Sequence, residues 1–127
     1  MSEQLQLIFT LLVIYQIKHF IADFPLQREY MLRKTLAGWD FLLPLTLHCL
    51  VHGLGTFVIV MFYNPSLWWL AILDFVIHFL IDRLKSGPRY FGRFNDLTKA
   101  GFWTVLGLDQ MFHQLTHIYI IWVIVTA

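Results

Sequence analysis

The chain has 127 residues, enough for one domain, and 58% of them are hydrophobic while only 13% are charged. Charged residues make up about a quarter of an ordinary soluble domain, so this composition is typical of a membrane protein and not of a soluble one. The formal net charge of +1 argues against a nucleic-acid partner, and the single cysteine, Cys49, excludes an intrachain disulfide and a thiolate zinc cluster.

Four apolar stretches are each long enough to cross a bilayer as a helix, which takes about 20 residues. The first carries His19 and Asp23 and lacks both a basic leader and a small-residue cleavage site, so we interpret it as a retained helix and not as a signal peptide. The stretches cover roughly residues 5–25, 41–62, 66–85 and 105–126. They predict an all-α, integral membrane four-helix bundle that forms a single domain over residues 1–127.

The basic residues predict the orientation of this bundle. All but one of the nine lysines and arginines lie in or next to the first and third connectors: Arg28, Arg33, Lys34, Arg83, Lys85, Arg89, Arg93 and Lys99. Because basic residues gather on the cytoplasmic side, both termini should face away from the cytoplasm, in a multi-pass protein of the cell inner (cytoplasmic) membrane. Lys18 lies inside the first stretch, where it could pair with an aspartate or extend toward a headgroup.

Histidines and aspartates interrupt the apolar stretches at intervals of four residues. Residues four apart lie on one face of a helix, so each stretch has one polar face. Ionisable groups inside a bilayer cost several kcal/mol unless they are paired, metal-bound or hydrated, and we therefore expect these groups to point into the bundle. They are His19, Asp23, His48, His52, Asp74, His78, Asp82, Asp109, His113 and His117.

The depth of each polar group follows from the rise of about 1.5 Å per helical residue. This estimate predicts one layer of four histidines between a shallower carboxylate layer and a deeper mixed layer. The histidine layer holds His19, His48, His78 and His113, the shallow layer Asp23, Asp82 and Asp109, and the deep layer His52, Asp74 and His117.

The polar pattern also repeats along the chain. Residues 19–23 resemble residues 78–82, and residues 47–52 resemble residues 112–117. The repeat predicts two helical hairpins related by a pseudo-twofold axis along the membrane normal. The alternative is a chance match among apolar residues.

Imidazole and carboxylate groups on facing helices of a bundle are the ligands of a first-row metal. Zinc is the preferred cofactor, because histidine dominates and both glutamates, Glu3 and Glu29, lie outside the stretches, where they cannot form a diiron carboxylate site. The predicted ligands are His19, His48, His52, His78, His113 and His117. They exceed the four that one zinc needs, so either two ions bind or some groups orient the ligands and carry protons. A relay without metal and a network that only fixes helix packing are the alternatives.

Four short motifs carry a resemblance to a known family. In order and over nearly the whole chain, they resemble a family of small bacterial and phage membrane proteins of unknown function. The resemblance implies four membrane helices and a functional role for the motif positions, but no reaction; more distantly, the His-x-x-x-Asp pieces resemble membrane-bound metal-dependent hydrolases. The motifs are HxxxDFxxQ from His19 to Gln27, HxxxH from His48 to His52, HFxxDxxK from His78 to Lys85, and DQxxH from Asp109 to His113.

These features predict a membrane-embedded metalloprotein with a site in the cytoplasmic half of the bundle, acting as a hydrolase of a lipid or lipid-linked phosphate. Zinc would lower the pKa of a bound water, and Asp23, Asp82 or Asp109 would take its proton. The residues predicted to bind the substrate are Lys85, Arg93, Gln27 and Gln110, although the two basic ones also serve as topology signals.

Two other classes of function remain as alternatives. One is a proton or metal-ion channel or transporter, and the other is a non-catalytic membrane interaction protein of the phage exclusion or immunity type. The outer third of each stretch has no ionisable residue, so a continuous proton path across the membrane looks incomplete and a site that opens inward is favoured. The bilayer is the one partner predicted, and a homo-oligomer is left open.

Overall fold

The computed structural model describes residues 1–26, 33–36, 38–88 and 90–127. In these residues the chain forms four α-helices and no strand, so the predicted all-α class is confirmed. The helices are α1 (Glu3–Asp23), α2 (Leu42–Tyr63), α3 (Trp69–Ser86) and α4 (Ala100–Thr126), with short 3-10 helices η2 (Pro65–Leu67) and η3 (Phe91–Arg93) in the connectors.

Local hydrogen bonds explain where the helices begin. The Ser2 hydroxyl accepts from the Leu5 amide at 3.2 Å and so caps α1. Helix α3 begins at Trp69, later than the predicted residue 66, because Pro65 begins a 3-10 turn. In this turn the Asn64 side chain accepts from the Ser66 amide at 3.2 Å.

Helix α4 begins at Ala100, earlier than the predicted residue 105, after a turn at Asp96. The Asp96 carboxylate accepts from the Thr98 hydroxyl at 2.7 Å and from the Thr98 amide at 2.9 Å. These bonds hold the pKa of Asp96 below its ordinary value, since they favour the charged carboxylate.

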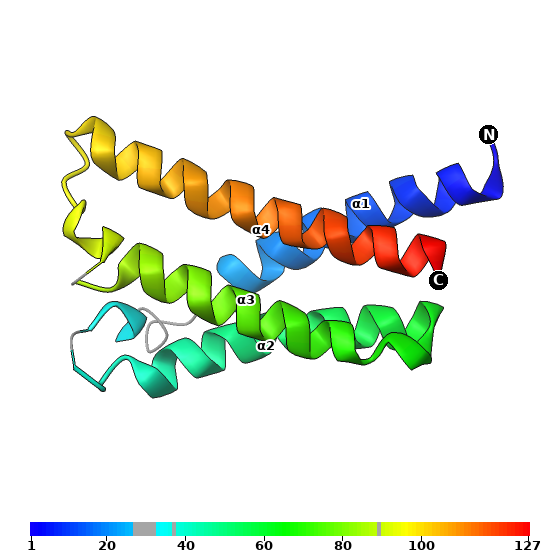
Figure 1. The fold of residues 1–127 in the computed structure, drawn as a ribbon, viewed down its shortest axis with the longest axis horizontal. Helices are drawn as coiled ribbons and strands as arrows, with labels where there is room; N and C mark the ends of the chain where they lie inside the picture. Colours follow the sequence, from blue (N-terminus) through cyan, green and yellow to red (C-terminus); the bar gives the residue numbers. More distant parts are fainter. Residues whose placement is uncertain (27–32, 37, 89) are drawn as a thin grey trace.

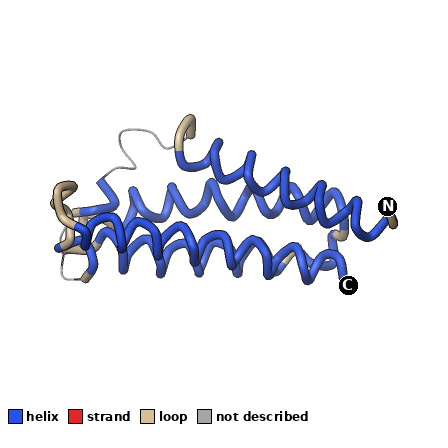
Figure 2. The backbone as a smooth tube through the Cα atoms, turned by 90° about the horizontal axis from the view of Figure 1, so that it is seen from above, coloured by secondary structure: helices blue, strands red, loops and turns tan. Residues whose placement is uncertain are grey.

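The four helices run antiparallel in chain order, so both termini lie at one end of the bundle (Figures 1 and 2). We call this the terminal end, and we call the opposite end, where α2 and α4 begin and α3 ends, the connector end. Helix α2 packs most closely on α3, while α1 lies against α2 and α4, and α4 against α3. A Cβ atom at Gly53 would lie 3.2 Å from Phe75 Cβ, so glycine permits the close approach of α2 and α3.

Apolar side chains fill only parts of the interior. The larger cluster closes the terminal end: Leu11, Tyr15, Ile59, Val60, Leu67, Leu70, Ile120, Ile121 and Ile124. A smaller one, formed by Phe41, Leu45 and Cys49, lies near the connector end of α2 against Phe75 and Phe79. The interior between these clusters is polar.

The outer surface of the helices is apolar. Large side chains stand exposed along it, among them Phe9, Phe57, Leu80, Leu115 and Trp122. Among the helices in the described residues, α1 and α2 are long and apolar enough to cross a membrane by length and composition. Burying charges while exposing aromatic and aliphatic side chains reverses the usual distribution in a soluble protein.

Candidate metal centre

The polar faces of all four helices meet inside the bundle. Nine of the ten predicted polar residues are buried, and Asp23, whose side chain is 20% exposed, is the most accessible. The four-residue spacing accounts for this, because it holds each set on one helical face. The expectation that these groups point inward is therefore met.

Two groups of three side chains lie nearest the connector end. In the first, His52 Nε2 is 2.8 Å and His48 Nε2 is 3.5 Å from Oδ1 of Asp23. We call Asp23, His48 and His52 the first triad.

In the second group, His113 Nε2 lies 3.1 Å from Asp82 Oδ1 and 3.0 Å from Asp109 Oδ1. We call Asp82, Asp109 and His113 the second triad. His48 joins the two triads, since its Nε2 is also 3.2 Å from Asp82 Oδ2. Within each triad, the three ligand atoms all lie within 4.8 Å of one another, so each triad could hold one ion.

Asp74 organises the deeper part of the site. Its carboxylate accepts from Lys18 Nζ at 2.7 Å and from the Thr56 hydroxyl at 2.5 Å, and it lies 2.8 Å from His78 Nδ1. The prediction that Lys18 could pair with an aspartate is confirmed. Lys18 Nζ is also 3.4 Å from His117 Nε2, so one lysine connects α1 with α3 and α4.

The deep network also includes two hydroxyl groups that the sequence interpretation missed. Tyr15 OH lies 3.2 Å from Thr56 Oγ1, and both side chains are buried. A signal for them exists in the sequence: Tyr15 precedes His19 by four residues, and Thr56 follows His52 by four. Extending the four-residue pattern to hydroxyl side chains would have found both.

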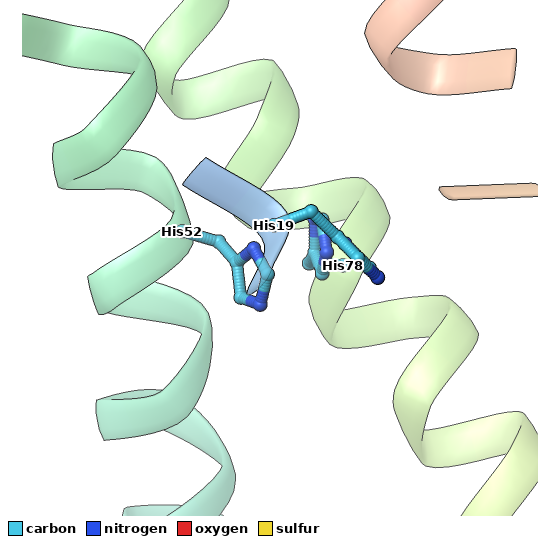
Figure 3. A group of neighbouring side chains, drawn as sticks. All are labelled: His19, His52 and His78. Carbon is cyan, nitrogen blue, oxygen red and sulfur yellow. The ribbon is translucent and has the colours of Figure 1, made fainter. Parts of the chain in front are cut away.

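The predicted layer of four histidines is wrong at α2. The rings of His52 and His78 stack with centroids 3.8 Å apart, and those of His78 and His113 at 4.0 Å. His52, and not His48, therefore lies beside His78, and Figure 3 shows His19, His52 and His78 converging from α1, α2 and α3. His48 lies among the carboxylates, because the edges of an apolar stretch do not fix the axial position of a helix to within one turn.

A polar pocket of about 180 Å³ is lined by every residue of the two triads except His52. All three predicted catalytic aspartates line it, and two lysines reach in beside them. Lys34 Nζ is 3.2 Å from Asp82 Oδ2, and Lys85 Nζ is 3.4 Å from Asp109 Oδ2. The lining residues are Asp23, Phe24, Lys34, His48, Asp82, Lys85, Leu106, Asp109, Gln110 and His113.

Of the residues predicted to bind substrate, some line the polar pocket and others do not. Lys85 and Gln110 line the pocket, and the Gln110 amide donates to Asp109 Oδ2 at 3.0 Å while its Oε1 lies 3.0 Å from His19 Nε2. Arg93 lies in η3 with its guanidinium over the Phe94 ring, and it is not among the residues that line the pocket. Gln27 lies outside the described residues.

Lys34 was interpreted from the sequence as an orientation signal only. Its place beside Asp82 could not be read from the pattern, because a basic residue in a connector looks the same whether it faces the water or folds back into the bundle.

The donor set suits divalent metal ions. Within the described part of the chain, the ring nitrogens of His48, His52 and His113 that face the carboxylates are the Nε2 atoms, and these are the atoms that would bind an ion in the triads. The Nδ1 atoms of the same rings are buried without a hydrogen-bond partner. Two atoms that are each about 2.0 Å from a tetrahedral zinc lie roughly 3.3 Å apart, close to the separations within the triads. His78 also has the geometry of an oriented ligand, since Asp74 holds its Nδ1 and leaves Nε2 available.

Two further groups could hold an ion deeper in the bundle. They are His19, His52 and His78, and Asp74, His78 and His117. Each shares His78 with the other, whereas the first and second triads share no residue. Two ions could therefore occupy the first and second triads at once, and residues of both triads line the same pocket.

A comparison with known families gives one match. The model of the family described as "Protein of unknown function (DUF3307)" matches residues 8–127, in agreement with the resemblance to an uncharacterised family. No curated protein and no solved structure matches the chain. The match covers α1 from residue 8 onward, the other three helices and both triads.

Proposed function

The chain belongs to the DUF3307 family, and from its own residues we propose that it is a membrane-embedded metalloprotein that hydrolyses a lipid phosphate or a lipid-linked phosphate. The observation that carries the proposal is the pair of triads on one pocket. Each offers three ligands, which leaves an ion positions for water and substrate, as in catalytic zinc sites. Zinc is the preferred ion, and His48 between the triads would set two such ions side by side.

The exposed surface supports four membrane spans. On α3, Asp74 and Asp82 are buried while Ile72 and Leu80 are more than half exposed. On α4, Asp109 is likewise buried, whereas Ile118 is half exposed. Charges inside and apolar groups outside suit a bundle whose solvent is lipid. With the basic connectors in the cytoplasm, the pocket opens inward from the inner membrane.

A first prediction concerns this topology. In a Cys49→Ala background, a cysteine at Asn64 should react with a membrane-impermeant thiol reagent added outside intact cells, because the second connector has no basic residue. A cysteine at Asp96, which is exposed in the third connector, should react only after the cytoplasmic side is opened. The reverse pattern would invert the bundle and place the pocket on the outer side.

The pocket residues divide the work of hydrolysis. The ions would supply a bound water with a lowered pKa. Asp109 is best placed to take the water proton, because its Oδ2 faces the pocket beside Lys85. The water oxygen forms a bond to phosphorus, the P–O bond to the leaving group breaks (an ester bond in a lipid monophosphate, an anhydride bond in a lipid diphosphate), and the leaving oxygen takes a proton from the solvent. Lys34 and Lys85 would hold the phosphate oxygens.

Transport across the membrane has less support. The polar interior ends at the apolar cluster of the terminal end, where Leu11, Val60, Leu70 and Ile120 are fully buried. An ion or a proton that entered from the connector end would meet this cluster before it reached the other side. The arrangement favours a site with one opening.

A second prediction tests hydrolysis directly. Protein in lipid nanodiscs, loaded with zinc, should release phosphate from a diacylglycerol phosphate or an isoprenyl diphosphate. Asp109→Asn should reduce the rate at least about 10²–10⁴-fold, since it removes the general base and also weakens a ligand of the second triad. Gln16→Ala is the matched control, because Gln16 pairs with Gln114 on the exposed face of α1 and α4, away from the pocket. Equal rates for the wild type and Asp109→Asn would rule out this role for Asp109, and no release by metal-loaded wild type would rule out the reaction.

A further inference from the structure

An apolar groove follows the outer face between α3 and α4. Its inner part, nearer the connector end, has a volume of about 340 Å³ and its outer part about 440 Å³. We call the two together the α3–α4 groove. The inner part is lined by Ile81, Leu84, Lys85, Phe91, Val105, Leu108, Asp109 and Phe112. The outer part is lined by Trp69, Leu73, Ile77, Ile81, Phe112, Leu115, Thr116 and Tyr119.

The groove is continuous with the polar pocket. Ile81 and Phe112 line both parts of the groove, so the parts meet there. Lys85 and Asp109 line both the inner part and the polar pocket, and among the residues that the structure describes they are the only charged ones that line the groove. An apolar path therefore leads along α3 and α4 to the ammonium group and the carboxylate beside the second triad.

Lys85 lies where three cavities meet. Besides the polar pocket and the groove, it lines a cavity of about 380 Å³ toward the third connector, together with Ser86, Asn95 and Phe102. Its side chain is 32% exposed, whereas that of Asp109 is 2% exposed. Lys85 can therefore meet an anion that approaches along the membrane surface, while Asp109 stays within the site.

The length and direction of the groove suit a lipid tail. From Trp69 to Lys85 the helix rises about 24 Å, at roughly 1.5 Å per residue. Half of the hydrocarbon core of a bilayer is about 15 Å thick, so the groove extends past the middle of the membrane. A phosphate at Lys85 with its tail in the groove would have the orientation of a lipid in the cytoplasmic leaflet.

We propose that the α3–α4 groove binds the hydrocarbon chain of an anionic phosphate lipid while its headgroup enters the polar pocket past Lys85. This inference rests on the proposed function and names its substrate class: a phosphate carried on a long acyl or prenyl chain, delivered laterally from the membrane. The charge at one end and the apolar walls along the rest match the two ends of such a molecule.

The test uses a binding signal that does not require hydrolysis. Protein in nanodiscs is photolysed with a phosphatidic acid that carries a diazirine in its acyl chain, and the labelled residues are mapped by mass spectrometry. We expect labelling to concentrate at groove residues such as Ile81, Leu108 and Phe112. Leu108→Trp, which fills the groove, should reduce that labelling at least fivefold, and Lys85→Gln should reduce it for phosphatidic acid but not for phosphatidylcholine.

The control and the contrary results separate the two proposals. Leu80→Trp adds the same ring to an exposed position of α3 that does not line the groove, so it should leave the labelling unchanged. Labelling spread evenly over all outward faces, or equal loss in both tryptophan variants, would overturn the inference. Specific labelling without phosphate release would keep the lipid site and reject the hydrolase, whereas release that Leu108→Trp does not slow would keep the hydrolase and reject the groove.

Discussion

Purified without chelators or a nickel column, the protein should contain two divalent ions per chain, and His48→Ala should lose the ion of the first triad. His48 Nε2 lies 3.5 Å from Asp23 and 3.2 Å from Asp82, but its one lone pair can bind one ion, which we place in the first triad with Asp23 and His52. His52→Ala and His113→Ala each remove a ligand from one triad and should leave about one ion. Elemental analysis of folded, monodisperse protein gives the counts. Removing a ligand should weaken binding by more than the 10–100-fold that is typical of residues that only support a ligand.

Two further variants serve as controls for the metal count. Gln114→Ala changes a half-buried amide of α4 that pairs with Gln16 and belongs to neither triad, so it should keep both ions. His117→Gln changes a buried histidine outside the triads and should lower affinity without abolishing binding. A strong chelator should also lower the melting temperature of the wild type, since the ions bind only the folded chain. If the three alanine variants keep their full metal content, the histidines form a hydrogen-bonded packing network and the metalloprotein proposal fails.

Lys18→Met should destabilise the fold by about 3–5 kcal/mol, independently of metal. The substitution leaves the Asp74 carboxylate, which is completely buried, without the ammonium group 2.7 Å away. Methionine fills similar space, so the loss comes from the unpaired charge and not from a cavity. The melting temperature of detergent-solubilised protein, measured after metal removal, reports the effect.

The double variant Lys18→Met/Asp74→Asn tests this explanation. It removes both charges and keeps an amide that can bond Thr56 and His78, so it should recover most of the lost stability. A double variant that is as unstable as Lys18→Met would show that the lysine acts through its packing against α2, where a Cβ at Gly55 would lie 3.0 Å from Lys18 Cγ.

The sequence predicts the helices well because two simple signals define them. The length of the apolar stretches identifies all four helices, and the four-residue spacing of polar groups predicts which face of each helix turns inward. The connectors are less predictable: hydropathy alone does not show that α4 continues back to Ala100, where the Asp96 turn ends. The structure keeps the repeat in one respect, since Asp23 contacts His48 as Asp82 contacts His113.

The site is less predictable than the helices because it depends on how they slide past one another. If α2 slid along its axis by one turn, His48 would take the place that His52 has beside His78. Packing contacts such as that of Gly53 with Phe75 fix the axial position of α2. Lys34 and Arg93 are both basic residues of connectors, yet the first lies beside Asp82 and the second over Phe94. Nothing in the local sequence separates the two, because their places are set by where the connectors fold back.

Each of three buried aspartates has a lysine as counter-ion: Lys18 for Asp74, Lys34 for Asp82 and Lys85 for Asp109. A divalent ion at the second triad would compete with Lys34 and Lys85 for their carboxylates and leave those ammonium groups in need of an anion. A phosphate supplies that anion. Binding of the ion and of the phosphate should therefore be positively coupled, and by thermodynamic reciprocity each should tighten the other by the same factor, about 5–150-fold for a typical coupling. The lysines would then make the pocket receptive to an anionic headgroup chiefly when the ion is in place.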